Sequence, residues 1–240
     1  MKIEGRNAVY ELLKTATTID KILIQNGIKD DLVKQITKNS SSKNYKYQFV
    51  EKSILDKESE THKHQGFIAY VSDYKYVEIS DLLTSIKDKE DAFLVLLDGI
   101  EDPHNLGSII RVCECAGVDG IIIPKRRSAQ VNETVMRISE GSANHIAISR
   151  VTNLNQVIDA IKENNIWVYG LELGGEDIYK SNLKGRICIV VGGEDTGINR
   201  LTKEKCDVIV TIPMYGKVNS LNASVALGTA VFESVRQRRG

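Results

Sequence analysis

From Phe93 onward, the sequence predicts an α/β fold, because short runs of Val, Ile and Leu alternate with longer segments of helical character. This alternation is typical of a mostly parallel sheet with helices on both faces. The first 75 residues contain a second, shorter alternation of the same kind. We therefore expect a small N-terminal α/β domain over 1–75, a linker over 76–90 and a large domain over 91–240.

The N-terminal domain is expected to begin with a helix and to alternate from there. Its predicted elements, in chain order, are helix 6–14, strand 21–24, helix 31–38, strand 47–50 and strand 67–71. The polar, serine-containing run 37–45 predicts a loop. The polar segment 72–90 is expected to carry the linker and then a helix over 79–86.

The large domain shows neither an internal repeat nor a low-complexity tract, so its elements can be assigned one after another. They are, in chain order, strand 93–97, helix 105–116, strand 120–123, helix 131–139, strand 147–149, helix 154–163, strand 167–170, strand 187–191, helix 201–205, strand 208–212 and helix 223–236.

Composition places the chain among globular proteins: 240 residues, 42% hydrophobic and 27% charged. No apolar run approaches the length of a membrane span, and no signal-peptide core is visible, which predicts a cytoplasmic protein. The four cysteines lack Cys-x-x-Cys spacing and fall inside predicted elements, so we expect reduced core residues instead of a disulfide or metal site. The four histidines also lack metal-ligand spacing.

Formal net charge is zero, which is unusual for a nucleic-acid-binding protein. Residues 1–75 carry 13 Lys or Arg against 10 Asp or Glu, and the rest of the chain carries 19 against 22. Basic clusters occur at 125–127 and 236–239, where solvated loops or tails are an equally simple interpretation. Charge alone does not indicate an RNA-binding protein.

Three segments place polar residues directly after apolar strands. They are 97–117, 189–197 and 212–224, and each contains a turn with glycine and a few Asn, Ser, Glu or Arg side chains. Ligands of open α/β sheets bind beyond the carboxyl ends of the strands. The three turns are therefore expected to converge on one site.

Together these segments resemble the motifs of the SpoU (TrmH-like) family of RNA ribose 2′-O-methyltransferases in the SPOUT superfamily. The resemblance covers Phe93 to Arg238, and Ile3–Leu13 and His64–Ala69 resemble the N-terminal substrate domain of the ribosomal branch. It implies a trefoil knot tied after about Ile187, an N-terminal RNA-binding domain similar to the ribosomal protein L30e fold, and a homodimer. It further implies S-adenosylmethionine as cofactor and a guanosine of large-subunit (23S) ribosomal RNA as substrate.

By this resemblance, cofactor contacts fall largely on main-chain atoms. The expected cofactor-binding residues are Gly192, Gly193, Ile212, Met214, Leu221 and Ser224. The expected catalytic residues are Asn105, Arg111, Glu194, Ser220 and Asn222. Purely structural interpretations stay open: Asn105 and Asn222 as helix caps, Ile212 and Leu221 as core residues, Arg111 as a surface partner of Glu114, and Glu194 as a plain turn carboxylate. For Glu194, the buried strand 189–191 that leads into the turn instead favours a semi-buried role.

Arg111 is the residue whose role is hardest to assign. A guanidinium is almost never deprotonated, so a role as a base is unattractive. We expect Arg111 to stabilise the developing alkoxide or to clamp a phosphate. Since Arg111 and Asn105 are six residues apart and need not share a helix face, Arg111 could serve a neighbouring subunit.

Two further patterns concern partners. Tyr45, Tyr47, Tyr70, Tyr74 and Tyr76 could stack on unpaired bases or line a small domain. Helix 223–236 carries small residues and has apolar residues on more than one face, which predicts close packing against a second subunit. Rival functions are tRNA methylation, antibiotic-resistance methylation of ribosomal adenosine, and a catalytically idle RNA-binding assembly factor.

Overall fold

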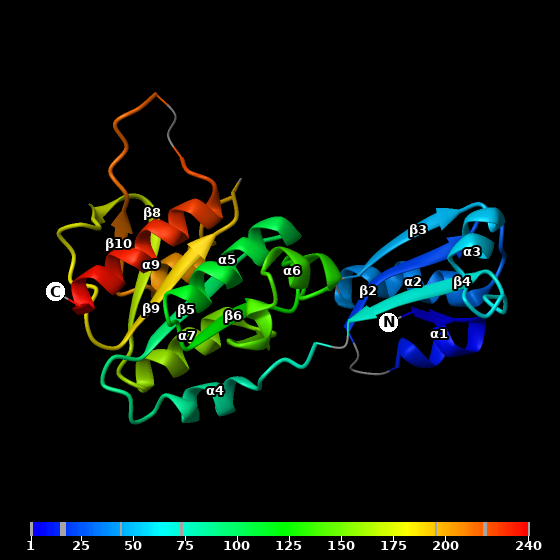
Figure 1. The fold of residues 1–240 in the computed structure, drawn as a ribbon, viewed down its shortest axis with the longest axis horizontal. Coiled ribbons are helices and arrows are strands. Elements are labelled where there is room, and N and C mark those ends of the chain that lie inside the picture. The colour runs from blue at the N-terminus through cyan, green and yellow to red at the C-terminus, as the bar shows by residue number, and fades with distance from the viewer. Residues whose placement is uncertain are drawn as a thin grey trace. The chain divides into compact units, whose positions relative to one another are not determined.

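The computed structural model describes residues 2–14, 18–43, 45–72, 74–194, 196–217 and 220–239. The chain forms two compact units, Met1–Lys75 and Tyr76–Gly240 (Figure 1). Each unit is an α/β structure, so the predicted fold class is confirmed. Asn44 of the predicted polar loop, Asp73 of the predicted linker segment, and Asp195, Val218 and Asn219 of the three turns lie outside the described residues.

The first unit is built on a four-stranded sheet in the order β1-β4-β2-β3, in which β2 and β3 are parallel and the other pairs antiparallel. Its elements are β1 (Lys2–Glu4), α1 (Arg6–Leu12), β2 (Thr18–Gln25), α2 (Asp31–Lys43), β3 (Lys46–Val50), α3 (Lys52–Glu58) and β4 (Phe67–Ser72). Strand β1 and helix α3 were not predicted, since each is short and carries few apolar residues.

The two faces of this sheet bury different strand residues. Ile22 and Ile24 of β2 pack in the cluster that includes residues of α1 and α2. Leu23, which alternates with them, packs with Leu55 of α3. Both faces are therefore covered there, which accounts for the uninterrupted apolar run 22–24 within β2.

The predicted loop 37–45 was largely wrong, because α2 continues to Lys43. Polar side chains in this stretch bond back to the helix instead of ending it. Thr37 Oγ1 donates to the Lys34 carbonyl at 3.1 Å, and Ser40 Oγ donates to the Thr37 carbonyl at 2.8 Å. Such i to i−3 bonds let hydroxyl residues remain within a helix.

The second unit is built on a six-stranded sheet in the order β10-β8-β9-β5-β6-β7, with every neighbouring pair parallel. Its strands are β5 (Phe93–Asp98), β6 (Gly120–Pro124), β7 (Ala147–Val151), β8 (Trp167–Asp177), β9 (Ile187–Gly192) and β10 (Val208–Thr211). Strand β8 is longer than predicted: beyond Gly170 its pairing with β10 shifts register and resumes at Glu176.

Helices cover both faces of this sheet, as the alternation predicted. They are α4 (Ile79–Ser85), α5 (Pro103–Cys115), α6 (Glu133–Ile138), α7 (Leu154–Glu163), α8 (Arg200–Lys205) and α9 (Ala223–Arg239), with a 3₁₀ turn at Ser142–Asn144. Helices α5 and α9 lie side by side on one face, while α4 and α7 contact the sheet from the other (Figure 1).

Residues 76–90, expected to hold a linker, fold with the second unit. Val77 forms an isolated bridge with Ser149, and its N–H donates to the Ile148 carbonyl at 2.9 Å. Leu82 and Ile86 are buried in the core beneath the sheet. Gly120 allows this close packing, since a Cβ there would lie 2.5 Å from Leu82 Cδ1.

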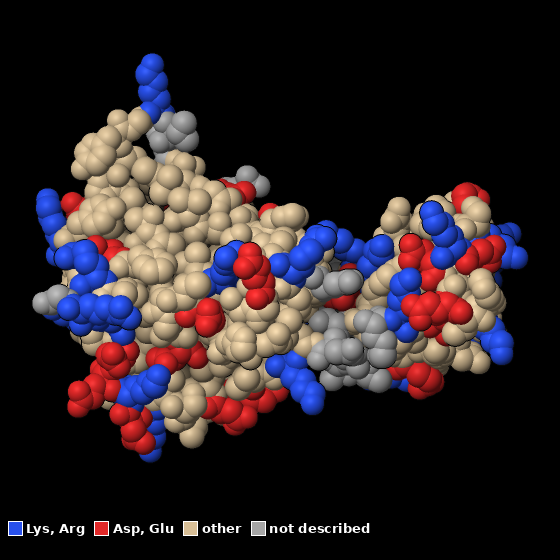
Figure 2. Space-filling model, in the orientation of Figure 1, with Lys and Arg blue, Asp and Glu red and all other residues tan. Residues whose placement is uncertain are grey.

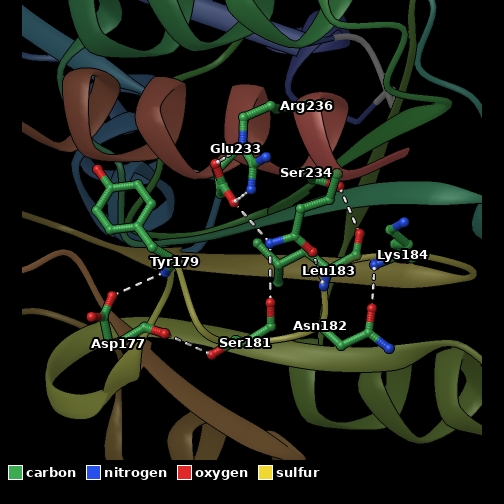
Figure 3. Close-up of polar contacts among 10 residues, drawn as sticks. Asp177, Tyr179, Ser181, Asn182, Leu183, Lys184, Glu233, Ser234 and Arg236 are labelled. Carbon is green, nitrogen blue, oxygen red and sulfur yellow. Dashed lines mark hydrogen bonds and ion pairs between the residues drawn. The ribbon is translucent and has the colours of Figure 1, made fainter. Parts of the chain in front are cut away.

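Helix α9 is tied at its C-terminal end to the segment that connects β8 and β9. Gln237 Oε1 accepts from the Leu183 N–H at 2.8 Å, and Gln237 Nε2 donates to the Ser181 carbonyl at 3.0 Å and to Glu233 Oε1 at 2.8 Å (Figure 3). Ser234 Oγ donates to the Leu183 carbonyl at 2.9 Å. These bonds satisfy backbone groups of an irregular segment beside a buried helix face.

Two composition-based expectations can be compared with the structure. Cys113 and Cys188 are buried free thiols, whereas Cys115 is exposed, so the expectation of four core cysteines was wrong for that residue. Cys206 is half-buried, and burial raises the pKa of its thiol to about 12. None of the described helices is both long enough and apolar enough to cross a membrane.

Candidate functional site

Three of the predicted catalytic residues meet at the carboxyl edge of the large sheet, each from a different turn. Asn105 lies in the first turn of α5, Glu194 follows β9, and Asn222 precedes α9. Asn105 Nδ2 donates to Glu194 Oε1 at 3.0 Å, and Asn222 Nδ2 donates both to Asn105 Oδ1 at 2.9 Å and to Glu194 Oε1. The expected convergence of the three turns is therefore present, and we call these residues the amide–carboxylate cluster.

Asn222 also caps α9, so the structural interpretation as a helix cap is confirmed and does not conflict with its place in the cluster. Its Oδ1 accepts from the Ser224 N–H at 3.0 Å, from Ser224 Oγ at 2.6 Å and from the Val225 N–H at 3.4 Å. Because a capping oxygen must face the helix N–H groups, the Asn222 Nδ2 is left to face Glu194. The helix cap thus fixes the direction of an amide in the cluster.

Asn105 and Glu194 differ in their exposure. Asn105 is 8% exposed and both of its amide atoms are bonded within the cluster, so its role as a plain N-cap is excluded: the α5 cap is Asp102, which accepts from the His104 N–H at 3.1 Å. Glu194 is exposed, which corrects the expectation of a semi-buried side chain. The turn carries Glu194 outward beyond the buried end of β9, leaving its second oxygen accessible.

A cavity of about 390 Å³ lies next to the cluster, lined partly by Glu194 itself. Besides Glu194, five of the six predicted cofactor residues and one further predicted catalytic residue line it: Gly192, Gly193, Ile212, Met214, Leu221 and Ser220. Ser224 stands apart from this lining and is engaged in the α9 cap. The volume lies within the range of small-molecule sites, which are mostly apolar with a few placed polar groups.

Two glycines give this cavity a wall of bare backbone. A Cβ on Gly192 would lie 1.9 Å from the Gly197 carbonyl carbon, and a Cβ on Gly193 would lie 2.6 Å from the Gly99 carbonyl oxygen. No side chain fits at either position. The turn therefore presents main-chain N–H and C=O groups to a ligand, which suits recognition of a flat, hydrogen-bonding group such as a nucleobase.

Two carboxylates that sequence reasoning missed hold this turn in place. Glu172 Oε2 accepts from the Ile198 N–H at 2.9 Å. The buried Asp98 accepts from the Asn199 N–H at 2.9 Å and from Asn199 Nδ2 at 2.6 Å, and its carbonyl accepts from the Gly193 N–H at 3.0 Å. The only sequence signals were an acidic residue at the end of an apolar strand for Asp98 and an isolated acid before Gly174-Gly175 for Glu172.

Further lining residues were also missed, because they belong to the unpredicted continuation of β8 or to strand, turn and helix positions whose side chains gave no sequence signal of a site. They are Leu171, Glu172, Leu173, Val191, Thr196, Gly197, Thr211, Ala223 and Ala226.

Among the predicted catalytic residues, Ser220 lines the cavity without joining the cluster, and Arg111 does neither. Arg111 Nη1 donates to Glu140 Oε1 at 2.6 Å, and the partner considered from sequence, Glu114, is not the one it binds. Six residues along a helix correspond to a rotation of ~240°, so Arg111 and Asn105 lie on different faces of α5. Within one chain, Arg111 and the cluster are separate constellations.

The tyrosines considered for base stacking have different surroundings. Tyr45 is buried and its hydroxyl donates to the Ile36 carbonyl at 2.8 Å, which fits a core role. Tyr70 donates to Glu58 at 2.6 Å, and the Tyr76 hydroxyl accepts from the Val131 N–H at 2.9 Å. Tyr47 is 39% exposed.

The described part of the chain contains no evident set of metal ligands. No group of three or more His, Cys, Asp or Glu side chains is placed there to hold an ion.

Comparison with protein families assigns both units. Residues 92–232 match the SpoU rRNA Methylase family, and residues 2–77 match the domain described as RNA 2′-O ribose methyltransferase substrate binding. Curated relatives named as TrmH family tRNA/rRNA methyltransferases include one from Staphylococcus aureus strain COL, 45% identical over 98% of this chain and 96% of the relative. A Staphylococcus haemolyticus relative is 44% identical over 98% and 95%.

Solved structures share the fold. The SpoU methyltransferase AviRb from Streptomyces viridochromogenes, in complex with AdoMet, superposes with a TM-score of 0.64 at 22% identity, covering 100% of this chain and 91% of AviRb. An AdoMet-bound rRNA methyltransferase from Sinorhizobium meliloti gives 0.60 at 22% identity, covering 98% and 86%. The A. aeolicus TrmH/SpoU tRNA-modifying enzyme gives 0.57 at 27%, covering 67% and 82%.

Both family matches, near-complete coverage by relatives at 45% identity and the convergence of three turns beside one cavity agree. The chain therefore belongs to the SpoU (TrmH-like) family and is an RNA 2′-O-ribose methyltransferase with the substrate-binding N-terminal domain of that family.

Proposed function

We propose that this enzyme uses S-adenosylmethionine to methylate a guanosine ribose in large-subunit ribosomal RNA. The observation that carries the chemistry is the amide–carboxylate cluster at the edge of the 390 Å³ cavity, where Glu194 belongs to both. The ribosomal substrate is supported by the N-terminal substrate-binding domain, by the resemblance of its motifs to the ribosomal branch and by the family description.

The cavity suits S-adenosylmethionine. The main-chain groups around Gly192 and Gly193 would hold the adenine, while Ile212, Met214 and Leu221 would pack on its faces. When bound, the cofactor supplies an electrophilic methyl group. Everything else must come from the chain: orienting the 2′-hydroxyl, accepting its proton and stabilising the charge on its oxygen.

Glu194 is placed to orient the ribose hydroxyl. Its Oε1 is held by the Asn105 and Asn222 amides, and Oε2 has no partner within the described residues. We propose that Oε2 accepts first the hydrogen bond and then the proton of the 2′-hydroxyl, as the methyl group passes from the cofactor sulfur to the hydroxyl oxygen. Ser220, which is exposed and also lines the cavity, is a second candidate for orienting the nucleotide.

Arg111 would complete the site from a second subunit. Its guanidinium cannot act as a base, but it can stabilise developing negative charge or clamp a phosphate. Because Arg111 lies on another face of α5 from the cluster, a single chain does not bring them together. A homodimer in which each site combines the cluster of one chain with Arg111 of the other removes this difficulty.

The exposed face of α9 supports such a dimer. Val225 and Phe232 are 53% and 49% exposed and lie two turns apart on one stripe, with Thr229 between them. Figure 2 shows the face crossed by α9 as largely free of charged side chains, with basic residues gathered near its C-terminal end. An exposed apolar stripe on an otherwise polar protein surface is typical of a protein–protein interaction site.

The N-terminal unit offers an aromatic pair for RNA. Tyr47 and Phe49 alternate along β3, which is an edge strand, and their rings meet edge to face with centroids 6.0 Å apart. They are 39% and 45% exposed. Aromatic faces on a domain with an excess of Lys and Arg suit stacking of unpaired bases, so we propose that this pair contacts the RNA.

Two further expectations remain proposals. In the sheet, β9 lies between β5 and β8 although it follows β8 in the chain, an order compatible with a trefoil knot tied after about Ile187. An RNA substrate and free cysteines support a cytoplasmic enzyme.

The deciding experiment maps 2′-O-methyl groups on ribosomal and transfer RNA from cells with and without the gene. We expect one guanosine of large-subunit ribosomal RNA to lose its methyl group, and purified enzyme with S-adenosylmethionine to restore it. Loss of a tRNA methyl group instead would overturn the ribosomal assignment. Unchanged methylation of both RNAs, with no transfer in vitro, would favour the idle assembly factor.

Cofactor placement has its own test. A fragment of residues 76–240 contains every residue lining the cavity, so it should bind S-adenosylmethionine in calorimetry as the full chain does. Binding by the full chain and none by the folded fragment would refute the placement.

A further inference from the structure

Helices α5 and α6 approach each other closely at Gly107. A Cβ on Gly107 would lie 2.7 Å from both Cβ and Cγ2 of Ile138, so no larger residue fits there. Arg111 is four residues further along α5 and therefore lies on the same face as Gly107. The packing of α6 against α5 consequently brings the residues that follow Ile138 beside Arg111 (Figure 1).

The residue that meets Arg111 is Glu140, and its backbone conformation is unusual. Glu140 has φ of +49°, in the left-handed region that favours glycine. It follows the C-cap Ser139 of α6, the position where helices most often place Gly or Asn. The turn is closed by main-chain bonds, including Gly141 N–H to the Met136 carbonyl at 3.1 Å, and these bonds do not need a glutamate side chain.

Stability does not explain a glutamate at this position. Its ion pair with Arg111 is exposed, with side chains 67% and 49% accessible, and exposed pairs contribute little to folding. A non-glycine residue held in a disfavoured conformation without a gain in stability is a reason to look for a functional role. What the Glu140 side chain does is hold the guanidinium of Arg111.

We infer that Glu140 is a positioning residue, which holds the Arg111 guanidinium in the orientation needed by the RNA. The inference rests on the proposed role of Arg111. The ion pair engages Nη1, so Nε and Nη2 remain available, among the described residues, for a phosphate or the 2′-oxygen. Fixing a long, flexible side chain before the substrate arrives removes an ordering cost from the reaction.

The test compares Glu140→Gly and Glu140→Gln in the full-length enzyme, on whichever RNA the wild type methylates. Glycine relieves the left-handed backbone and removes the carboxylate, whereas glutamine keeps an oxygen that can reach Arg111. We expect kcat to fall roughly 10-fold to 100-fold in Glu140→Gly and less in Glu140→Gln. S-adenosylmethionine affinity and Tm should not fall in either variant.

A chemical readout tests the contact without relying on activity. Phenylglyoxal modifies accessible arginines, and the Arg111 peptide can be followed by mass spectrometry. Its modification rate should rise in the order wild type, Glu140→Gln, Glu140→Gly. As a matched control, Asn165→Gly changes another left-handed residue, with φ of +56°, which follows α7, and should leave kcat and the Arg111 rate unchanged.

The outcomes distinguish a failure of the Glu140 inference from a failure of the proposed role of Arg111. Faster Arg111 modification together with wild-type kcat in Glu140→Gly would overturn the positioning role. An unchanged modification rate would overturn the ion pair itself in solution. If Arg111→Ala itself retains full activity, the proposed role of Arg111 fails, and the Glu140 inference falls with it for a distinguishable reason.

Discussion

Helix α5 carries two polar constellations that differ in how they are built. Asn105 belongs to the amide–carboxylate cluster, which joins three turns of one chain. The Asn105 residue is only 8% exposed. Arg111, six residues later, lies in an exposed ion pair with Glu140. All residues of the cluster come from one chain. The Arg111–Glu140 pair is exposed and can therefore contact a partner subunit or RNA.

The difference shows how one helix can serve two sites. Residues near the helix N-terminus point toward the carboxyl edge of the parallel sheet, where ligands bind. A residue ~240° around the helix cannot reach that edge and instead faces α6. The cluster is therefore preorganised by folding alone, and under the proposed function Arg111 contributes only when a second surface meets it.

The largest expected effect tests whether Arg111, in the exposed pair with Glu140, is catalytic. Arg111→Ala should lower kcat about 1000-fold while S-adenosylmethionine affinity stays within a few-fold, because removing a preorganised charge acts on the transition state. Rapid-quench methyl transfer and calorimetry measure the two quantities. Arg111→Lys keeps the charge without the planar fork and should recover only part of the rate. An equal loss of affinity and rate would place Arg111 at the cofactor instead.

The next effect tests whether a second chain is what completes the site. Phe232→Glu, on the exposed stripe of α9, should break the dimer and lower activity about 100-fold, since misplacing a catalytic group costs rates of this order. Light scattering measures mass alongside activity. Leu201→Glu in α8, at a similarly exposed leucine, is the control and should alter neither. If the wild-type protein is a monomer with full activity, the proposed dimer is refuted.

A smaller effect separates the two roles of Asn222. Asn222→Ala removes both the cap and the amide, and should cost about 1 kcal/mol of stability together with activity. Asn222→Ser keeps a capping oxygen but has no Nδ2 for Glu194, so it should unfold like the wild type and lose about 10-fold in kcat. Denaturant unfolding and initial rates measure the pair. Wild-type activity in Asn222→Ser would reduce Asn222 to a cap.

In the N-terminal unit, the aromatic pair should affect binding more than chemistry. Tyr47→Ala is expected to raise KM for RNA about 10-fold with kcat unchanged, because stacking on a base contributes about 1–3 kcal/mol. Tyr10→Ala, a half-buried tyrosine of α1, controls for the loss of an aromatic ring. Equal KM values for Tyr47→Ala and wild type would show that Tyr47 on β3 does not contact the RNA.

The smallest expected effect is the acid sensitivity of the N-terminal unit. Burial raises the pKa of Glu4, but hydrogen bonds from the hydroxyls of Ser59 and Thr61 and from backbone N–H groups outweigh it and lower the pKa to about 2. A lowered folded-state pKa stabilises above the ordinary value of 4.5, and this contribution disappears as pH falls from 4.5 toward 2. Calorimetry should show that Glu4→Gln lowers Tm at pH 7, and that its Tm converges with that of the wild type as the pH approaches 2. Parallel curves at all pH values would contradict this role.

Much of the fold could be predicted because apolar periodicity is local. Every predicted strand of the large domain is present, and the three Gly-containing turns follow strands as the sequence indicated. The errors are equally physical: α2 runs through Ser40 because its hydroxyl bonds back to the helix, and β8 extends past Gly170 because β10 pairs with it again at Glu176. Neither bond can be read from composition.

The sequence by itself determined which residue types stand after which strands, and so which residues could share an edge. Only the tertiary structure decided that Asn105, Glu194 and Asn222 bond to one another while Arg111 turns to Glu140. The reason is that a side chain's direction depends on its angle around the helix and on what packs there. In this protein a glycine at 107 and a left-handed glutamate at 140 set that packing, although they stand 33 positions apart in the sequence.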